Sequence, residues 1–460
     1  MTIPDRVVVA AAAAIAAAVW RGSALVGALA VVAAALCLGV GGRRRAAFWL
    51  IAAACASGAG VRADRAWSGL EPDVVGPYLG WSLVVDDPQP LAASTRVILE
   101  VGGERFEYWA RGRAAQLRAR SWRAGERVVV SGERRALDAA RARRVAWQHV
   151  VGRFDLQWAG DVVGGAPVAT ASNRVRATLE RAAATMPPRD GALYRGLVIG
   201  DDRDQSAEMI ARFRSSGLSH LTAVSGQNIA LLLSACGPVL RHLRAPARWA
   251  VTLLLIGWFA VLTRFEPSIL RAGTMAALAA TAQATGREHA PARTLGLAVA
   301  VLLVIDPLIC WSVGFWLSVG ATWGVAVVGP SLARGLARLR MLATPLGITL
   351  GAQLGVAVPS VLVFGRLPLV SVPANLLAVP VAGFVMLYGL PAGVLAGWVP
   401  ALAPVVMWPA QLGTRWVDTV AALGARLEPP GPWVVVGWIA IGLAVTVWCL
   451  VPPADDEAVD

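Results

Sequence analysis

Polar side chains interrupt an apolar stretch between Ser216 and Leu233, and their types could support chemistry. A serine acts as a nucleophile when a base lies within hydrogen-bonding distance and a third group orients that base. His220 and Ser225 would be such a pair in an intramembrane hydrolase. Five residues of a helix turn through about 500°, however, so the two side chains would point in different directions. No carboxylate lies near them in the sequence to orient the histidine.

Two other interpretations of this stretch remain open. In the first, the serine and threonine bond to the preceding turn, while the other polar side chains join neighbouring helices. In the second, the polar side chains line a water-filled path, and the glycine allows a helix break or a close approach. Polar residues in later apolar runs extend this path, because a buried charge in a bilayer costs at least about 2.5 kcal/mol and usually faces the protein interior. The predicted path consists of His220, Ser225, Gly226, Gln227, Asn228, Arg271, Gln353 and Asn375. Arg264 and Glu266 are interpreted as an external loop.

The composition places these residues in an integral membrane protein. Hydrophobic residues make up 57% of the chain and charged residues 15%, whereas soluble domains have roughly 45–50% and about 25%. Three apolar runs within 1–61 (7–20, 22–42 and 46–61) lack a cleavage pattern, so they predict N-terminal transmembrane helices rather than a signal peptide. A transmembrane core is predicted at 217–452, followed by a short acidic tail at 453–460. Its spans are expected at 218–240, 249–263, 267–285, 294–305, 308–329, 341–364, 367–390, 394–424 (as one span or as a broken one) and 432–451. Several of these are shorter than a straight span requires, which predicts buried or re-entrant segments.

Residues 62–165 between the two membrane regions predict a small all-β domain. Alternating apolar residues at 95–101 and 104–110 flank Gly102-Gly103, which is a hairpin pattern. Further strands are expected at 126–131 and 144–151. The pattern is typical of a five-stranded barrel of the OB type. Residues 166–216 then form an amphipathic, Arg-bearing helical connector, expected to lie in the membrane interface.

Arginine clusters predict the orientation of the chain. Four short basic loops lie at 43–45, 241–248, 287–293 and 334–340, and each consecutive pair is separated by two predicted spans. The positive-inside rule therefore places all four in the cytoplasm. The β domain, one span beyond Arg45, is then extracytoplasmic, and we expect a multi-pass protein of the cell inner membrane.

The β domain is also a candidate for docking DNA. Residues 100–160 contain thirteen Arg against seven Asp and Glu, with tryptophans interleaved. Basic grooves with aromatic platforms bind single strands in OB folds, and a solvated face over an aromatic core would produce the same residues. The predicted docking residues are Trp109, Arg111, Arg113, Arg118, Arg120 and Trp122. All 42 basic residues of the chain are arginine, which also fits a genome that favours Arg codons.

Cofactor motifs are absent from the sequence. The five cysteines lie in apolar runs without metal-ligand spacing, and the four histidines are scattered, so no metal site is predicted. The sequence contains no GxxxxGK[ST] loop and no lysine that could complete one. We expect no cofactor and no catalytic residue, and energy for any directed transport would come from a cytoplasmic partner.

The segment from about Ala192 to Leu395 resembles the ComEC family of DNA-uptake channels. The resemblance rests on six segments in order: LYRGLVIGDDR, FRSSGLSHLTAVSG, EPSILRAGTMA, DPLICWSVGFWLS, GAQLGVAVPSVLVFG and PANLLAVP. It implies an inner-membrane channel that passes single-stranded DNA inward during natural transformation. The expected partners are single-stranded DNA, the lipid bilayer, an external DNA-receptor protein, a cytoplasmic DNA-translocating ATPase and a separate nuclease.

Two departures from the family pattern matter. Gln227-Asn228 stands where the family usually has leucine-histidine. Any role of that family histidine is therefore not expected in this chain. The metallo-β-lactamase-like domain of many members is also missing from this sequence, and no HxHxDH-type cluster is present, so nuclease activity is not expected. The alternative function is a membrane-embedded transporter or intramembrane enzyme on the same fold, although no internal repeat typical of transporters is found.

Overall fold

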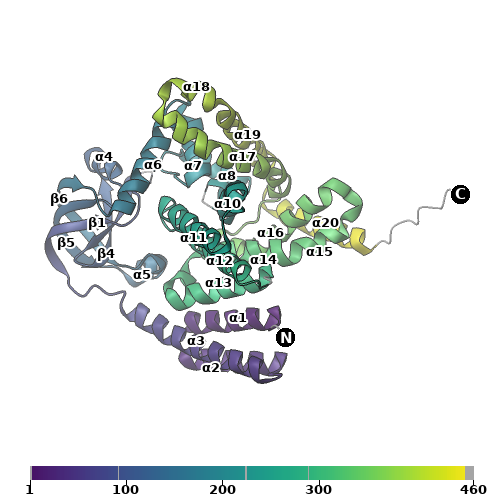
Figure 1. The fold of residues 1–460 in the computed structure, drawn as a ribbon. Helices are drawn as coiled ribbons and strands as arrows, with labels where there is room; N and C mark the ends of the chain where they lie inside the picture. Colours follow the sequence, from purple (N-terminus) through teal and green to yellow (C-terminus); the bar gives the residue numbers. More distant parts are fainter. Residues whose placement is uncertain (1–2, 92, 223–224, 288–289, 451–460) are drawn as a thin grey trace.

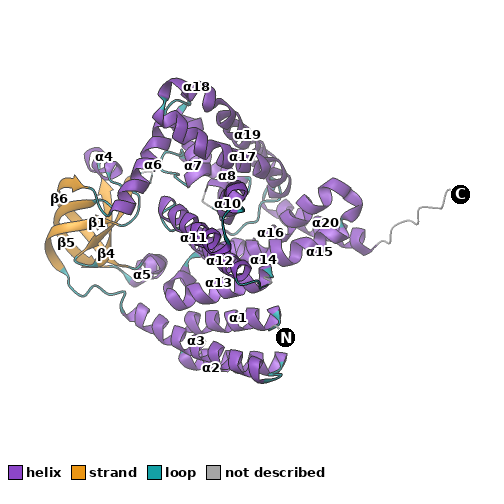
Figure 2. Cartoon of the chain, viewed as in Figure 1, coloured by secondary structure: helices purple, strands orange, loops and turns teal. Residues whose placement is uncertain are grey.

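A computed structural model describes residues 3–91, 93–222, 225–287 and 290–450. A small β domain lies at one side of a helical assembly, and three N-terminal helices pack beneath the rest (Figures 1 and 2). The prediction of a largely helical protein with one small β domain is confirmed at this level. The predicted acidic tail at 453–460 lies outside the described residues.

The N-terminal helices form a three-helix layer. They are α1 (Asp5–Arg21), α2 (Ala24–Leu38) and α3 (Arg43–Ser68). Gly22 ends α1 in the left-handed conformation, at φ +57°, and the side chain of Ser23 then accepts a hydrogen bond from the Val26 amide to begin α2. Glycine and serine caps are favoured at these positions because they satisfy exposed backbone groups. Small buried side chains, among them Ala18 and Ala56, let the helices pack closely.

The strands of the β domain close into a barrel. They are β1 (Gly76–Val84), β2 (Gln89–Pro90), β3 (Ser94–Val101), β4 (Glu104–Arg111), β5 (Arg127–Ala136) and β6 (Val150–Val163). Their pairing order is β1-β5-β6-β4-β3-β2, and β3 also pairs with β1, which closes the ring of five strands. The β4–β6 pair is parallel and the other pairs are antiparallel. Helices α4 (Arg113–Ser121) and α5 (Ala139–Val145) lie in the connections.

The predicted hairpin of the β domain is confirmed, and one predicted strand is wrong. Gly102 and Gly103 have φ values of +64° and +90°, which only glycine adopts readily, and they turn β3 into β4. A strand expected at 144–151 is mostly helix, because the side chain of Asp138 accepts a bond from the Arg141 amide and begins α5. The 3₁₀ helix η1 (Ala146–Gln148) follows, and β6 starts only at Val150.

The connector consists of α6 (Pro167–Ala183), α7 (Pro188–Ile199) and α8 (Ala207–Ser215). The apolar face of α6 packs against protein: Leu179 is fully buried in the largest apolar cluster. A Cβ at Gly397 would collide with the carbonyl oxygen of Thr178, so α6 and the last turn of α17 are in direct contact. Helix α6 of the connector is therefore packed into the helical assembly, and the position of the connector in the membrane interface stays a prediction.

The remaining helices form the core. They are α9 (Ser219–Thr222), α10 (Gly226–Leu240), α11 (Ala245–Leu262), α12 (Pro267–Ala284), α13 (Pro291–Ile305), α14 (Val313–Trp323), α15 (Gly329–Gly335), α16 (Ala343–Phe364), α17 (Ser371–Trp398), α18 (Ala403–Val406), α19 (Trp408–Leu427) and α20 (Gly431–Leu450). A π-helical segment, η3 (Gly324–Val328), joins α14 to α15, and the short 3₁₀ helices η2 (Pro307–Trp311), η4 (Ala337–Leu342) and η5 (Pro400–Leu402) complete the connections. The boundary expected between spans at 390–394 is wrong, since α17 runs on to Trp398.

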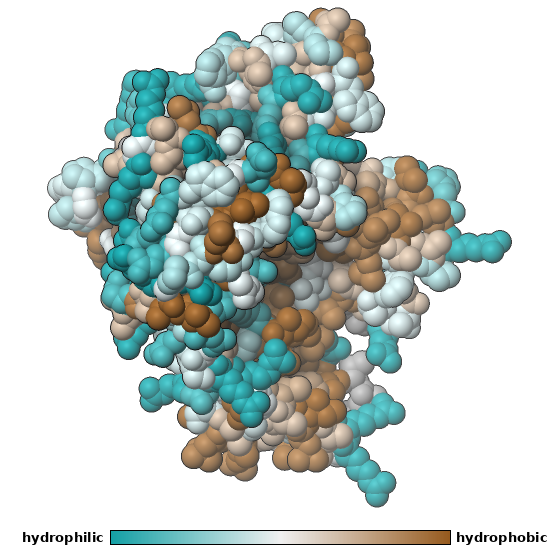
Figure 3. Space-filling view, turned by 90° about the vertical axis from the view of Figure 1, so that its left-hand side faces the viewer, coloured by the Kyte–Doolittle hydropathy of each residue, from teal (hydrophilic) through white to brown (hydrophobic). Residues whose placement is uncertain are grey.

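Six of the described helical segments are long and apolar enough to cross a membrane by length and composition. They are Arg43–Ser68, Ala245–Leu262, Val313–Gly335, Ala337–Phe364, Ser371–Trp398 and Gly431–Trp448. The shorter apolar helices α2, α10 and α13 fall below that length. In Figure 3, which looks onto the β domain, hydrophilic side chains gather over the barrel, and apolar side chains dominate the lower region of α1–α3. These features are those of a membrane protein.

Glycines bring α14 and the η3 segment that continues it into backbone contact with α16. A Cβ at Gly320 would collide with the carbonyl oxygen of Gly355, and one at Gly324 would collide with that of Gly351. No side chain fits in such gaps, so glycine at these four positions allows the close crossing. Small residues spaced four apart are a common way for helices to pack in membranes.

Candidate functional site

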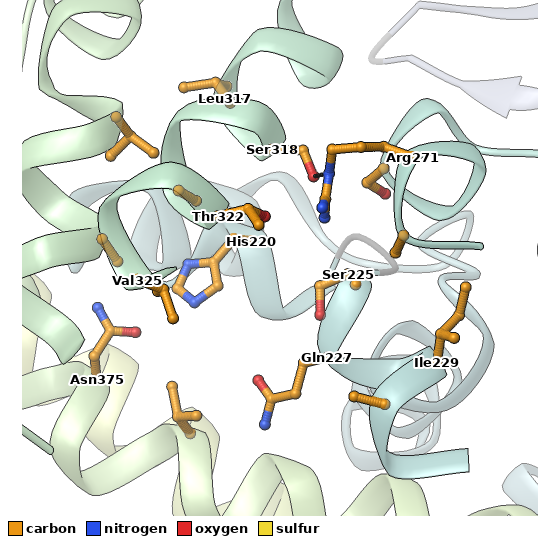
Figure 4. Close-up of a pocket in the computed structure, with 18 of the residues that line it drawn as sticks. His220, Ser225, Gln227, Ile229, Arg271, Leu317, Ser318, Thr322, Val325 and Asn375 are labelled. Carbon is orange, nitrogen blue, oxygen red and sulfur yellow. Dashed lines mark hydrogen bonds between the residues drawn. The ribbon is translucent and has the colours of Figure 1, made fainter. Parts of the chain in front are cut away.

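A cavity of about 1790 Å³ lies among the helices of the core. Its walls come mainly from α10, α12, α14, α16 and α17, and its lining is mostly apolar with a set of polar side chains. Figure 4 shows side chains from these helices surrounding one space, with His220, Gln227 and Asn375 around its middle and Arg271 beside Ser318.

The polar stretch singled out in the sequence coincides with the start of a helix. Ser225 is in the extended conformation, which is a break in the helical backbone, and α10 begins directly after it at Gly226. The Ser225 hydroxyl donates to Oδ1 of Asn228 over 3.3 Å, and across the described residues no hydrogen bond joins it to His220. The break presents a helix N-terminus and several side chains to the cavity.

The structure brings seven of the eight predicted path residues onto the wall of this one cavity. These are His220, Ser225, Gly226, Gln227, Arg271, Gln353 and Asn375. The eighth, Asn228, is buried beside the lining, where it accepts the Ser225 bond. Asn375 is held by its side-chain amide, which donates to the Ser371 carbonyl oxygen over 2.7 Å.

Arg271 is a buried cation at the cavity wall. The residue is 4% exposed, its Nε donates to Oγ of Ser318 over 2.8 Å, and its Nη1 lies 3.1 Å from the sulfur of Met275. A Cβ at Gly226 would lie 2.6 Å from Nη2, so the guanidinium sits directly against the start of α10. Ser318 anchors this side chain from α14, a role the sequence did not indicate.

Other polar lining residues were missed in the sequence. Ser318 and Thr322 lie one turn apart on α14, and that spacing on one helix face was the available signal. Glu266, interpreted as part of an external loop, lines the cavity, as does Asp202 of the GDDR segment. Together the charged lining residues are five arginines and two acidic residues: Arg214, Arg241, Arg248, Arg271, Arg366, Asp202 and Glu266.

A buried ion-pair network joins the β domain to the helices beside this cavity. Asp87, in the β1–β2 loop, accepts two bonds of 3.1 Å from Arg264 and lies 2.9 Å from Nη2 of Arg176 on α6. Burial alone would raise the pKa of Asp87, but these two guanidiniums outweigh burial and hold that pKa well below its usual range. For the neighbouring Asp86, burial followed by the Asp87 charge dominates and raises the pKa from 3.8 to about 6.

The same network reaches the GDDR segment. Asp201 is buried and bonded to Arg203 over 2.7 Å, and Arg203 also donates to Glu180 over 2.9 Å. Burial would raise the pKa of Asp201, but the bond from Arg203 and the surrounding arginines lower it to about 2. For Asp202, burial together with the Asp201 charge prevails and raises the pKa. Asp202 lines the cavity while Asp201 anchors the connector.

The predicted docking residues of the β domain do not share one environment. Arg111, Arg113, Arg118 and Arg120 are all exposed on or beside α4. Trp109 is half-buried with the guanidinium of Arg141 5.2 Å from its ring centre. Trp122 is 1% exposed and packs beside Tyr108 in the barrel core. A fully buried ring cannot stack on a base, so the interpretation of Trp122 as a docking residue is wrong.

Potential metal ligands do not cluster in the described part of the chain. Within its ranges, no group of three or more His, Cys, Asp or Glu side chains comes together as a metal centre would require.

Similarity to known proteins centres on the segment that holds this cavity. A family model described as "Competence protein" matches residues 197–453, more than half of the chain. The chain belongs to the competence protein family. This confirms the family resemblance that the motifs predicted, and the match includes the cavity and the break before α10. No solved structure matches the chain.

Three curated relatives are similar over part of their length. "ComE operon protein 3" of Bacillus subtilis (strain 168) is 29% identical over 211 residues, which cover 44% of this chain and 26% of the relative. "Competence protein ComA" of Neisseria gonorrhoeae is 33% identical over 143 residues, 28% of this chain and 20% of the relative. "Uncharacterized protein YcaI" of Escherichia coli (strain K12) is 29% identical over 219 residues, 42% of this chain and 28% of the relative. The match thus spans between a fifth and somewhat more than a quarter of these relatives.

Proposed function

We propose that this protein is an inner-membrane channel that passes single-stranded DNA into the cytoplasm during natural transformation. The observation that carries the proposal is the large cavity, lined by polar side chains, inside the segment that defines the competence family. One of the matched relatives, "Competence protein ComA", is named for competence. The path through the cavity would be formed by His220, Ser225, Gly226, Gln227, Arg271, Gln353 and Asn375.

The size of the cavity favours a polymer over a small molecule. Small-molecule pockets usually measure about 300–1,000 Å³, and this cavity has about 1790 Å³. A mostly apolar wall with a few polar groups would let an anionic strand slide, because a conducting path must bind its cargo weakly enough to release it. The excess of arginine over acidic residues in the lining would favour an anion.

The contacts of the loops support the orientation expected from arginine clusters. Arg293 pairs with Asp5 over 2.9 Å, and the indole of Trp249 donates to Thr281 over 3.0 Å, so these basic loops and the N-terminus lie at one end of the helices. The β domain contacts the opposite end, where His149 lies 3.0 Å from Asp306. By the positive-inside rule the β domain is then extracytoplasmic and the chain a multi-pass inner-membrane protein.

The β domain would receive the strand outside the membrane. The ring of pairings, with one parallel pair and a helix between β4 and β5, supports an OB-type barrel. OB folds bind single strands on a basic, aromatic-bearing groove. The four exposed arginines near α4 and the half-buried Trp109 are the groups available for such docking. Partners would be an external DNA-receptor protein, a cytoplasmic DNA-translocating ATPase and a separate nuclease.

The bonding of Ser225 favours a channel over the alternative of a membrane-embedded transporter or intramembrane enzyme. A nucleophilic serine is bonded to its base, whereas this hydroxyl donates to an asparagine carbonyl oxygen.

Loss of uptake tests the proposal. In a naturally transformable strain whose own gene is deleted, the wild-type chain should restore uptake of marked DNA into a nuclease-resistant pool, while the Gly226→Leu variant should restore surface binding only. A side chain at 226 collides with Arg271 and Ala272, 2.6 and 3.0 Å from a Cβ. Gly257→Leu on α11 is the matched control, since its Cβ meets nothing within 4 Å. Normal uptake in the deletion strain would refute the proposed function.

A further inference from the structure

Arg271 carries a charge without a carboxylate partner in the described structure. It lies in the second turn of α12 and is 4% exposed, yet among the described residues its side chain bonds only to a hydroxyl and a thioether. Within 3–91, 93–222, 225–287 and 290–450, no carboxylate forms an ion pair with it. Arg176, which is buried to a similar degree, is by contrast paired with Asp87 and Asp201. Burying a charge without a partner is costly, so such a group usually serves a ligand.

The guanidinium and the start of α10 face the same point of the cavity. Its Nη2 lies 2.6 Å from where a Cβ of Gly226 would be, and that residue is the first of α10. Ser225 makes no side-chain cap to this helix, so the first amide groups of α10 are not covered by it. The N-terminus of a 15-residue helix carries a partial positive charge and points N–H groups outward, which suits an anion.

We propose that Arg271 and the first turn of α10 form a binding site for one phosphodiester group. The proposal rests on the proposed function, and it names the part of the strand that the cavity recognises. A guanidinium donates charge-assisted N–H bonds to the free oxygens of a phosphodiester. The attraction between one cation and one singly charged phosphate would hold each phosphodiester of the strand in turn. A single such contact is weak enough to release each phosphodiester again. Glycine at 226 leaves the space in which the phosphate approaches the helix.

The bond from Arg271 to Ser318 sets the direction of the guanidinium. With Nε held by the hydroxyl and Nη1 by the thioether, Nη2 is the nitrogen that bonds to no described residue and can reach the cargo. Figure 4 shows the guanidinium beside Ser318, directed toward the space that Ser225 and Gln227 also face. The site therefore belongs to the cavity and not to a helix–helix contact.

A cross-linking experiment on the full chain in phosphatidylcholine nanodiscs tests the site. A photoreactive benzoylphenylalanine at Thr322, one turn from Ser318 on the cavity wall, reports on a labelled 15-mer of thymidine. Arg271→Gln should lower the cross-link yield at least tenfold, and Arg271→Lys, which keeps the charge but not the guanidinium that Ser318 orients, about threefold. Arg415→Gln, which removes an exposed arginine outside the cavity, is the matched control and should change nothing.

A second probe separates phosphate recognition from loss of structure. A 15-mer with a neutral methylphosphonate backbone should cross-link weakly to the wild-type chain, and Arg271→Gln should not weaken it further. Equal yields of the charged 15-mer from wild type and Arg271→Gln would overturn this site while leaving the channel intact. No cross-link from the wild-type chain at Thr322, or at Gln353 as a second position, would overturn both the site and the proposed function.

A phospholipid headgroup contains the same phosphodiester chemistry and is the other source to distinguish. Native mass spectrometry of the purified chain would count retained phosphatidylglycerol in wild type and Arg271→Gln. Loss of one lipid in the variant with an unchanged yield for the thymidine 15-mer would assign the site to lipid and overturn its role toward the strand. Unchanged lipid with a tenfold drop in yield is the expected result.

Discussion

Replacing Asp87 by Asn should release the β domain from the helical core. Asp87 accepts from Arg264 and from the Ala124 amide and lies 2.9 Å from Arg176. The two arginine side chains are only 10% and 3% exposed. Asparagine keeps the shape of the side chain but removes the charge that both cations need. The variant therefore tests the charge of the contact rather than its packing.

The size of the effect follows from the partners that remain. Removing one partner of a buried pair costs about 3–5 kcal/mol, because the other charge is left without compensation. Arg176 still has Asp201 at 3.8 Å and the Leu262 carbonyl oxygen, and Arg264 keeps its bond to Asn173. We therefore expect a cost at the lower end of that range, about 3 kcal/mol. This cost corresponds to roughly a hundredfold change in the equilibrium between docked and undocked barrel.

Hydrogen–deuterium exchange on the full chain in nanodiscs measures this equilibrium between docked and undocked barrel directly. Peptides covering 84–91, 122–126 and 260–265 should show roughly a hundredfold less protection of their backbone amides against exchange in Asp87→Asn than in wild type. The amides of the barrel interior should keep their wild-type protection. Asp155→Asn is the matched control: Asp155 also lies between two arginines, but these are exposed, and exposed ion pairs contribute little. A second change, Arg264→Gln, should restore part of the protection. Unchanged exchange in Asp87→Asn at these peptides would refute the reasoning.

Three further outcomes are expected. Asp86→Asn should raise the stability roughly three times as much at pH 7.5 as at pH 4.5, as measured by the midpoint of thermal unfolding. The folded pKa of Asp86 is about 6 against an ordinary 3.8, so stability is lost as pH rises through these values, by at most about 3 kcal/mol. An equal effect at both pH values would contradict this. In a chain without native cysteines, Ala140→Cys should react with a membrane-impermeant thiol reagent in intact cells and Ala247→Cys should not; the reverse pattern would reject the orientation. Changing Arg111, Arg113, Arg118 and Arg120 to Gln should flatten the salt dependence of single-strand binding, by about 0.7 in log–log slope for each phosphate that the protein no longer neutralises. Salt-independent binding of the wild-type chain would argue against docking. Trp122→Ala should instead destabilise the barrel by about 3–5 kcal/mol, because Trp122 is a core residue.

Local patterns in the sequence were sufficient for much of the fold and for seven residues of the cavity wall. Runs of apolar residues mark α3, α11 and α16 because a bilayer admits few charges. The paired glycines at 102 and 103 mark the β3–β4 turn because only glycine adopts that backbone readily. Seven of the predicted path residues lie on the cavity wall, and six of them were singled out because a polar side chain in an apolar run must face something other than lipid. Each of these signals needs only a few neighbouring residues.

Tertiary structure decided what those residues touch. Trp122 was interpreted as a docking residue because composition does not distinguish a buried ring from an exposed one, and closure of the barrel places it in the core. Strand β1 was missed because its pairing partners lie far along the chain, as where Gly76 pairs with Arg134. The bonds between Asp87 and Arg264 join residues 177 positions apart. Whether Arg271 has a counter-ion likewise depends on which helices surround it, and that is set by the packing of α10, α12 and α14, which no short stretch of sequence records.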